Sequence, residues 1–146
     1  MEKASFFGRF FALFLDNILI GLIGGALGCC VYLPISLLGA GSESDFLGVL
    51  LGLAGLLLMA VLFFLQFIYF GYFWGKDGQS LGMKLLNIKV VQRNGDQITF
   101  LRGALRGTFG YWVSGLVFGL GFLWAAFDDE KETWHDKIFD TWVVTT

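Results

Sequence analysis

The sequence predicts an all-α membrane protein with a small β element, and three observations lead to that fold class. Hydrophobic residues make up 56% of the 146 residues, charged residues only 15%, and mean hydropathy is +0.71. Such values lie far from those of soluble domains. The apolar residues also gather into long stretches, as membrane helices require. We therefore expect a single membrane domain over residues 1–146.

Two long apolar stretches, residues 10–38 and 46–74, predict transmembrane helices. Each is longer than the ~20 residues that a helix needs to cross about 30 Å of hydrocarbon, so tilt or extra turns outside the bilayer are expected. The short link at residues 39–45 is acidic and turn-like. The two helices should therefore run antiparallel.

A third apolar stretch, residues 107–127, is shorter and interrupted by glycines. The stretch carries no charge, and its part from Tyr111 to Phe127 is 17 residues long, which is the lower limit for spanning. It either crosses once or dips into the bilayer and returns at Gly119-Leu120-Gly121. We favour the re-entrant or interfacial arrangement, because a C-terminal strand left alone on the outer side would have nothing to pair with.

The loop at residues 75–100 predicts a small cytoplasmic β-hairpin. Residues 87–92 and 97–100 read as strands, and Asn94-Gly95 between them is a strong hairpin turn signal because both residues accept positive φ. The tail, residues 128–146, ends in a further strand-like segment that could join the hairpin. This pairing requires the C-terminus to lie on the same side as the loop.

Basic residues predict the orientation in the membrane. Lys3 and Arg9 precede the first span, and several lysines and arginines follow the second. The positive-inside rule then places the N-terminus and the central loop in the cytoplasm of a multi-pass protein of the inner (plasma) membrane. Topology and anionic lipid explain the basic loop, so no nucleic-acid partner is expected.

Asp16 is the most informative residue, because it is a carboxylate inside the first apolar stretch. A charge there costs roughly 2.5–3.5 kcal/mol on insertion scales, so something must offset it. Arg9 lies about two helical turns earlier on the same face. Arg102 and Arg106, spaced i and i+4, are candidate counter-ions at the cytoplasmic rim.

Two interpretations of Asp16 stay open. In the first, the carboxylate forms an architectural salt bridge that holds the membrane segments together. In the second, Asp16 forms a polar site for a cation or proton with Asn17 and Gln66 of the second span. Gln66 alone is more typical of a hydrogen bond between helices.

No catalytic, cofactor or metal site is predicted, so we do not expect an enzyme. Cys29 and Cys30 are adjacent and lack further soft ligands nearby. His135 precedes Asp136, but no nucleophile stands in a suitable context. The acidic tail lacks the spacing of a calcium loop and is expected to neutralise the basic central loop.

Three motifs together resemble the RDD family, named for one arginine and two aspartates. They are Gly8-Arg9-Phe10-Phe11-Ala12-Leu13-Phe14-Leu15-Asp16, then Gly78-Gln79-Ser80-Leu81-Gly82-Met83-Lys84 with Ile88-Lys89-Val90-Val91 and Gly95, and finally Thr133-Trp134-His135-Asp136-Lys137 with Thr141-Trp142-Val143-Val144. The resemblance implies that Arg9, Asp16 and Asp136 are the name-giving residues, with Asp128 as the alternative to Asp136. Many members carry proline where this chain has Leu81.

The family that this chain resembles consists of small bacterial multi-pass membrane proteins, mostly of unknown molecular function. Some of its members are associated with the exchange of sodium or another monovalent cation for protons. The resemblance therefore implies Na⁺ or H⁺ as partners of a bilayer-embedded protein. Two or three spans seldom enclose an aqueous path, so exchange would require a homo-oligomer. The alternative is a non-transporting accessory or scaffold protein whose charged residues serve folding and docking.

Overall fold

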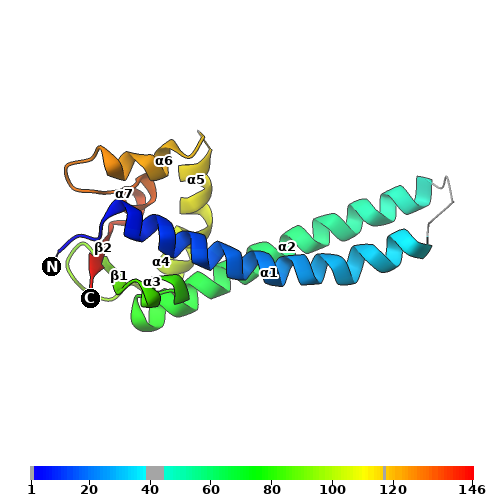
Figure 1. The fold of residues 1–146 in the computed structure, drawn as a ribbon, viewed down its shortest axis with the longest axis horizontal. Coiled ribbons are helices and arrows are strands. Elements are labelled where there is room, and N and C mark those ends of the chain that lie inside the picture. Colours follow the sequence, from blue (N-terminus) through cyan, green and yellow to red (C-terminus); the bar gives the residue numbers. More distant parts are fainter. Residues whose placement is uncertain (1, 39–44, 117) are drawn as a thin grey trace. The chain divides into compact units, whose positions relative to one another are not determined.

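The computed structural model describes residues 2–38, 45–116 and 118–146, and Figure 1 shows a mostly helical chain. Two long apolar helices and a small antiparallel sheet confirm the predicted fold class. In chain order the elements are α1 (Phe6–Leu38), α2 (Asp45–Asp77), α3 (Leu81–Leu85), β1 (Ile88–Gln92), α4 (Phe100–Leu105), the π-helical turn η1 (Arg106–Gly110), α5 (Tyr111–Gly115), α6 (Leu120–Leu123), the 3₁₀ turn η2 (Trp124–Ala126), α7 (Trp134–Phe139) and β2 (Thr141–Thr145). The chain divides into two compact units, one of residues 1–17 with 66–146 and one of residues 18–65.

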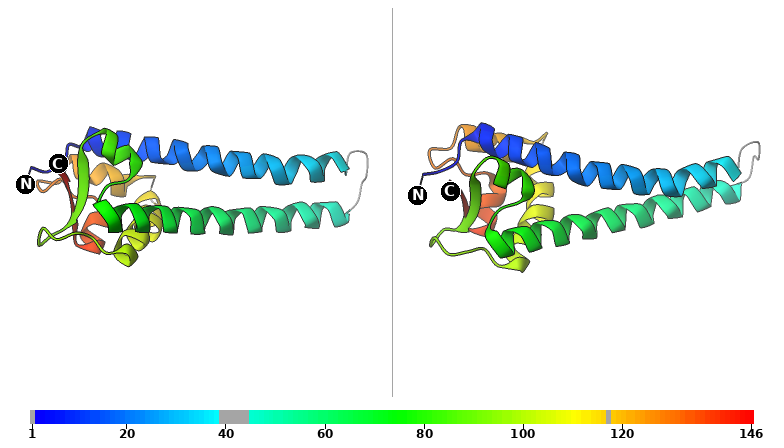
Figure 2. Two further views of the ribbon diagram at one scale, coloured as in Figure 1. Left: turned by 90° about the horizontal axis from the view of Figure 1, so that it is seen from below. Right: turned by 60° about the horizontal axis from the view of Figure 1, so that its bottom comes forward.

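The unit of residues 18–65 is a helical hairpin of α1 and α2 (Figure 2). Gly24 lies against the side chain of Leu62, so close that a Cβ atom at Gly24 would come within 2.8 Å of it. Small residues that allow close approach are typical of membrane helix pairs. Large apolar side chains on the outside, such as those of Leu22, Leu56 and Leu57, are exposed. Lipid is the natural cover for such a surface.

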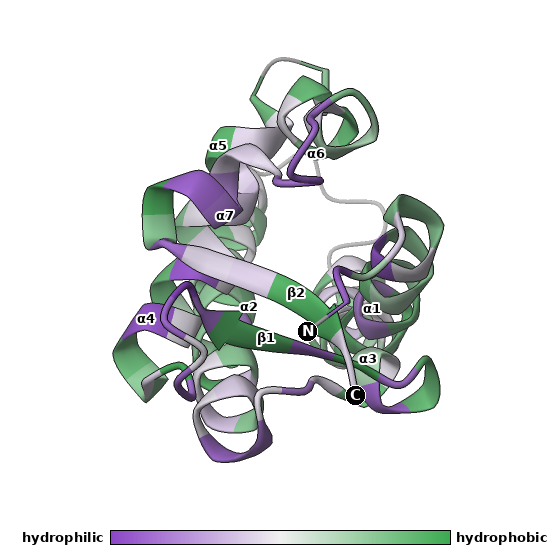
Figure 3. Cartoon of the chain, turned by 90° about the vertical axis from the view of Figure 1, so that its left-hand side faces the viewer, coloured by the Kyte–Doolittle hydropathy of each residue, from purple (hydrophilic) through white to green (hydrophobic). Residues whose placement is uncertain are grey.

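In the other unit, the two strands pair antiparallel, with Ile88 opposite Thr145 and Gln92 opposite Thr141. Figure 3 shows the sheet facing the viewer. The N-terminal segment joins it, because Ala4 N–H donates to the carbonyl of Val143 at 2.9 Å and Lys3 forms a bridge with Val144. The N-terminal segment therefore lies along β2, the C-terminal strand.

The pairing differs from the predicted hairpin. The turn is present, with Gly95 at φ +90° and its N–H donating to Gln92 at 2.8 Å. The returning segment, however, makes only an isolated bridge between Gln97 and Val91, and the C-terminal strand is the partner of β1 instead. Thr99 explains the difference, because its side chain accepts from Arg102 N–H and caps α4, so the segment turns into a helix rather than extending.

The third apolar stretch is bent. Residues 100–115 and 120–126 form two helical parts at 105° to one another, and Phe118 and Gly119 have φ values of +50° and +75°. Gly121 packs on Ser114, where a Cβ would lie 2.5 Å from the Ser114 Cα. This geometry is that of a broken span or a re-entrant loop, and the bend lies at the predicted glycine segment.

Candidate functional site

The first half of the site is centred on Asp136, which is fully buried at the start of α7. Thr133 caps this helix, and the two residues form a capping box in which each side chain binds the other's backbone N–H. The sequence Thr133-Trp134-His135-Asp136 thus fixes the Asp136 side chain locally. Its remaining acceptor sites point to residues from other elements.

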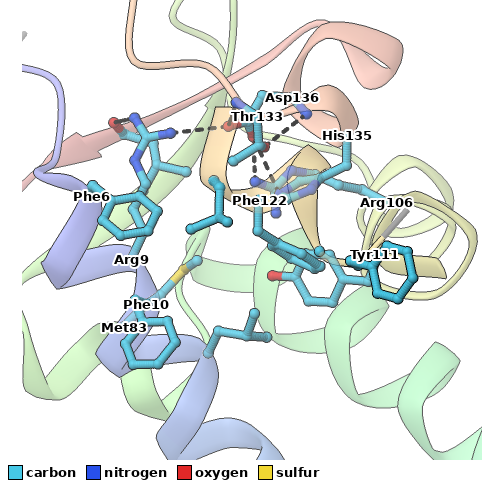
Figure 4. A pocket seen from close by; sticks show the side chains of 15 residues that line it. Phe6, Arg9, Phe10, Met83, Arg106, Tyr111, Phe122, Thr133, His135 and Asp136 are labelled. Carbon is cyan, nitrogen blue, oxygen red and sulfur yellow. Dashed lines mark hydrogen bonds and ion pairs between the residues drawn. The ribbon is translucent and has the colours of Figure 1, made fainter. Parts of the chain in front are cut away.

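Two arginines from distant segments hold the Asp136 carboxylate (Figure 4). Nη1 of Arg9 in α1 lies 3.0 Å from Oδ2, and Nη2 of Arg106 in η1 donates to Oδ1. Arg9 also donates to the carbonyl of Val143 at 3.1 Å, while Nε of Arg106 donates to the Thr141 hydroxyl at 3.1 Å. The cluster, which we call the arginine clamp (Arg9, Arg106 and Asp136), ties α1, η1 and α7 to β2.

The clamp sets the charge states around it. Burial alone would raise the pKa of Asp136, but Arg106, with His135 and Arg9, holds it well below its usual range. Asp136 is therefore ionised. Burial, with Arg106 nearby, lowers the pKa of His135 to about 3, so its ring is neutral at physiological pH.

His135 lies between Ser114 and Asp136 in an order that resembles a catalytic triad. Ser114 Oγ is 2.9 Å from Nδ1 of His135, and Nε2 is 3.9 Å from Oδ1 of Asp136. The ring packs against Tyr111, with ring centroids 4.8 Å apart. A general base works best with a pKa near the operating pH, and an imidazole with a pKa near 3 is far below that. The arrangement is suited to packing rather than to proton transfer.

The second half of the site is centred on Asp16, which is only 2% exposed. Its carboxylate accepts three hydrogen bonds, from the hydroxyl of Tyr69 at 2.7 Å, the hydroxyl of Ser80 at 2.5 Å and the backbone N–H of Gly82 at 2.8 Å. All three donors are neutral. Ser80 and Gly82 belong to the N-terminal end of α3, so Asp16 docks that short helix onto α1.

Gly82 is required at this contact. A Cβ atom there would collide with the carbonyl oxygen of Ala12 and lie 3.1 Å from Oδ1 of Asp16. The glycine in the central motif is thus explained by close approach of two backbones.

The expected counter-ions of Asp16 lie elsewhere. Arg106 pairs with Asp136, and Arg102 donates to Gln92 at 2.7 Å. Within residues 2–38, 45–116 and 118–146, no ion pair to Asp16 is present. The reason is geometric, because η1 directs Arg106 toward α7.

The two amides predicted beside Asp16 also bind other groups. Asn17 donates to the carbonyl of Leu13 within its own helix at 2.9 Å. Gln66 donates to the carbonyl of Gly107 at 2.8 Å, the bond between helices that is typical of a lone glutamine. It satisfies a carbonyl of the π-helical turn, a kind of turn often found at functional sites.

Several contributors were not singled out from the sequence. Tyr69, Ser80 and Gly82 surround Asp16, and Thr141 and Ser114 complete the polar contacts near Asp136. Ser80 and Gly82 stand in the motif at residues 78–84, and that was the available signal. Tyr69 gave none, because a single tyrosine in an apolar helix is ordinary.

The tail carries ion pairs with basic residues, as expected. Arg93 of the central loop lies 3.0 Å from Glu132 and 3.4 Å from Asp140, and Lys3 lies 3.2 Å from Glu130. In the part of the chain that the structure describes, no group of three or more histidine, cysteine and acidic residues is placed to hold a metal ion.

Comparison with known proteins agrees with the motifs. The sequence profile of the RDD family matches residues 3–140. The chain is also similar to the uncharacterized protein YxaI of Bacillus subtilis (strain 168), with 32% identity over 159 aligned positions that cover 99% of each chain. No solved structure matches the chain.

Proposed function

Because the chain belongs to the RDD family, we propose that it is a multi-pass plasma-membrane protein that exchanges a monovalent cation for a proton at Asp16. The observation that carries the proposal is the chemistry around this carboxylate. Asp16 is buried in an apolar helix, its three donors are neutral, and every arginine expected beside it is engaged elsewhere.

A buried carboxylate without a cationic side chain is stabilised by binding a cation or a proton. The hydroxyl groups of Tyr69 and Ser80 now donate to Asp16, but each oxygen also has lone pairs with which it can accept. If these hydroxyls turn, they and the carboxylate supply the oxygen ligands that hard cations prefer. One cation and one proton then compete for the same negative charge.

The arginine clamp has a different role in this proposal. Asp136 is held by Arg9 and Arg106 at once, so its charge is already neutralised by two guanidinium groups. We assign it to holding α1, η1 and α7 together rather than to carrying an ion.

We also propose that the protein works as a homo-oligomer with both termini in the cytoplasm. The helical hairpin exposes a large apolar surface. A Cβ atom added at Gly21, Gly25, Gly48 or Gly52 would have no neighbour within 4 Å. Such open small-residue positions allow another helix to approach closely. Basic residues at the N-terminus and in the central loop support the cytoplasmic side.

The test is proton flux in liposomes that contain the purified protein and a trapped pH dye. Adding sodium or potassium should change the internal pH, whereas choline should not. Asp16→Asn should abolish the response because the carboxylate is lost, and Asp129→Asn, at an exposed position, should keep it. If correctly folded wild-type protein gives no cation-dependent flux, the exchange proposal is wrong.

The second candidate is a non-transporting accessory or scaffold protein. Asp16 accepts hydrogen bonds from Ser80 and Gly82 at the N-terminal end of α3. These bonds hold α3 against α1, and a purely structural role for Asp16 would require the same bonds. Under this proposal Asp16→Asn lowers the stability of the fold, and neither the wild-type protein nor the variant moves protons in the liposome assay. No enzymatic activity is part of either proposal.

A further inference from the structure

The unit that contains both termini holds a cavity that the exchange proposal does not use, and the arginine clamp forms part of its wall. Its volume is about 350 Å³. The walls come from α1, α3, η1, α5, α6, α7 and β2, and most of the lining is aliphatic or aromatic, including Phe6, Phe10, Leu13, Met83 and Phe122. Figure 4 shows the side chains of Phe6, Phe10, Met83 and Phe122 around the cavity, with the clamp along one side of it.

Arg106, one of the lining residues, has one nitrogen atom without a hydrogen-bond partner. Arg106 lines the cavity and is 1% exposed, and its Nη1 is buried without any hydrogen-bond partner. Its Nε and Nη2 are used by Thr141 and Asp136, so Nη1 offers the remaining donors of the guanidinium group. An unsatisfied buried donor destabilises the folded protein, and more so when it is charged, so a ligand that accepts a hydrogen bond from Nη1 is favoured.

The net charge of the lining residues determines which charge the ligand's head group should carry. Arg9 and Arg106 face the single carboxylate of Asp136, so one positive charge is left over. His135, also on the wall, adds none, because burial keeps its ring neutral. An anionic head group therefore complements the wall, and a cationic one opposes it.

The residues at the opening of the cavity, which we call the rim, indicate that the rest of the ligand is apolar. Phe118 is 98% exposed, and Phe10 and Leu123 on the same lining are about half exposed. Exposed apolar side chains on a membrane protein face lipid, so the cavity opens where acyl chains are available. Its volume is near the lower end of the ~300–1,000 Å³ range of small-molecule pockets, which suits one chain and not a two-chain lipid.

We propose that this cavity binds a single-chain anionic amphiphile such as a fatty acid, with the carboxylate at Arg106 and the acyl chain along Phe6, Phe10, Met83 and Phe122. The site is separate from Asp16, which does not contribute to its lining. Binding does not depend on ion exchange, so the two proposals fail independently.

The test uses wild-type protein in nanodiscs of zwitterionic lipid and measures binding of radiolabelled myristate, corrected for empty nanodiscs. We expect saturable binding of one myristate per chain. Myristyl alcohol should bind roughly tenfold more weakly, because it lacks the charge that strengthens hydrogen bonds to arginine. Myristyl trimethylammonium should not compete.

A pair of variants locates the site. Leu123→Trp adds bulk at the rim and should weaken myristate binding at least tenfold, whereas Leu116→Trp, exposed on the same segment but outside the lining, should leave it unchanged. Circular dichroism confirms that each variant is folded. The proposal is overturned if wild-type protein shows no saturable myristate binding, if the three head groups bind equally, or if folded Leu123→Trp binds as wild type does.

Discussion

Nη1 of Arg9 lies 3.0 Å from Oδ2 of Asp136, and this ion pair joins residues that are 127 positions apart. Arg106 occupies the other oxygen of the same carboxylate. The first helix, the π-helical turn and the last helix therefore share one buried negative charge. Removing a shared partner should affect all three elements at once.

The first prediction concerns Asp136→Asn. The change leaves Arg9 and Arg106 buried with no counter-charge, and breaking a buried ion pair in this way typically costs about 3–5 kcal/mol. Thermal unfolding in detergent should show a markedly lower Tm. Asp129→Asn, at an exposed carboxylate, should not change the Tm measurably, and equal Tm values for the two variants would contradict the structural role of the clamp.

The second prediction is that stability falls as pH drops from about 6.5 to 5. His135 has a pKa of about 3 in the folded protein and near 6.5 when unfolded. Between these values the unfolded chain binds a proton that the folded chain does not. The contribution of His135 to the free energy of unfolding is therefore greatest above pH 6.5 and falls progressively as the pH drops below it. The slope is up to about 1.4 kcal/mol per pH unit.

His135 is the sole histidine, so the slope can be assigned to it. The depressed pKa of Asp136 affects stability only below the ordinary carboxylate pKa, about 3.9, outside this window. His135→Gln should make the Tm nearly independent of pH from 6.5 to 5. Ser114→Ala removes the hydrogen bond to the ring but not its burial, and should lower the Tm while keeping the slope. A slope that persists in His135→Gln would show that another group titrates.

Residues in the clamp could be predicted as important, but not their pairing. Arg9 and Asp136 stood in recognisable motifs, and Arg106 was a candidate because it shares a helical face with Arg102. Only the fold shows that Arg106 points to α7 and Arg102 to Gln92, because such partners depend on how several elements pack.

Hydropathy was a reliable guide to the long helices, because the bilayer imposes a minimum length of apolar sequence. The sheet was harder. Asn94-Gly95 does form a turn, yet Thr99 begins a helix, and the pairing of β1 with β2 depends on contacts between remote segments. Local propensity cannot specify such a partner.

The third prediction concerns Gly82→Ala. The new methyl group would collide with the carbonyl of Ala12, so α3 must move away from Asp16, at a cost of about 1–3 kcal/mol. Gly115→Ala is the matched control, because Gly115 is the last residue of α5, a Cβ there meets nothing within 4 Å, and a helical Gly→Ala change stabilises by roughly 0.5–1 kcal/mol. The Tm should therefore fall for Gly82→Ala and rise for the control variant. A Tm for Gly82→Ala at or above that of wild type would show that the close approach is dispensable.

The fourth prediction concerns the side of the membrane on which the C-terminus lies. Ala4 donates to Val143, and Lys3 bridges Val144, so the N-terminus and β2 must be on one side. With α1 and α2 as two crossings, this pairing requires the bent segment of residues 100–126 to re-enter rather than to span. A fluorescent protein fused after Thr146 should therefore be fluorescent in the cytoplasm, and alkaline phosphatase fused there should be inactive.

The matched control is a phosphatase fused after Leu38, at the end of α1. One crossing separates this position from the N-terminus, so the phosphatase should be exported and active. An active phosphatase after Thr146 would mean that the third segment crosses the membrane. In that case β2 could not pair with the N-terminal segment, and the clamp between Arg9 and Asp136 could not form as described, because its two partners would lie on opposite sides of the bilayer.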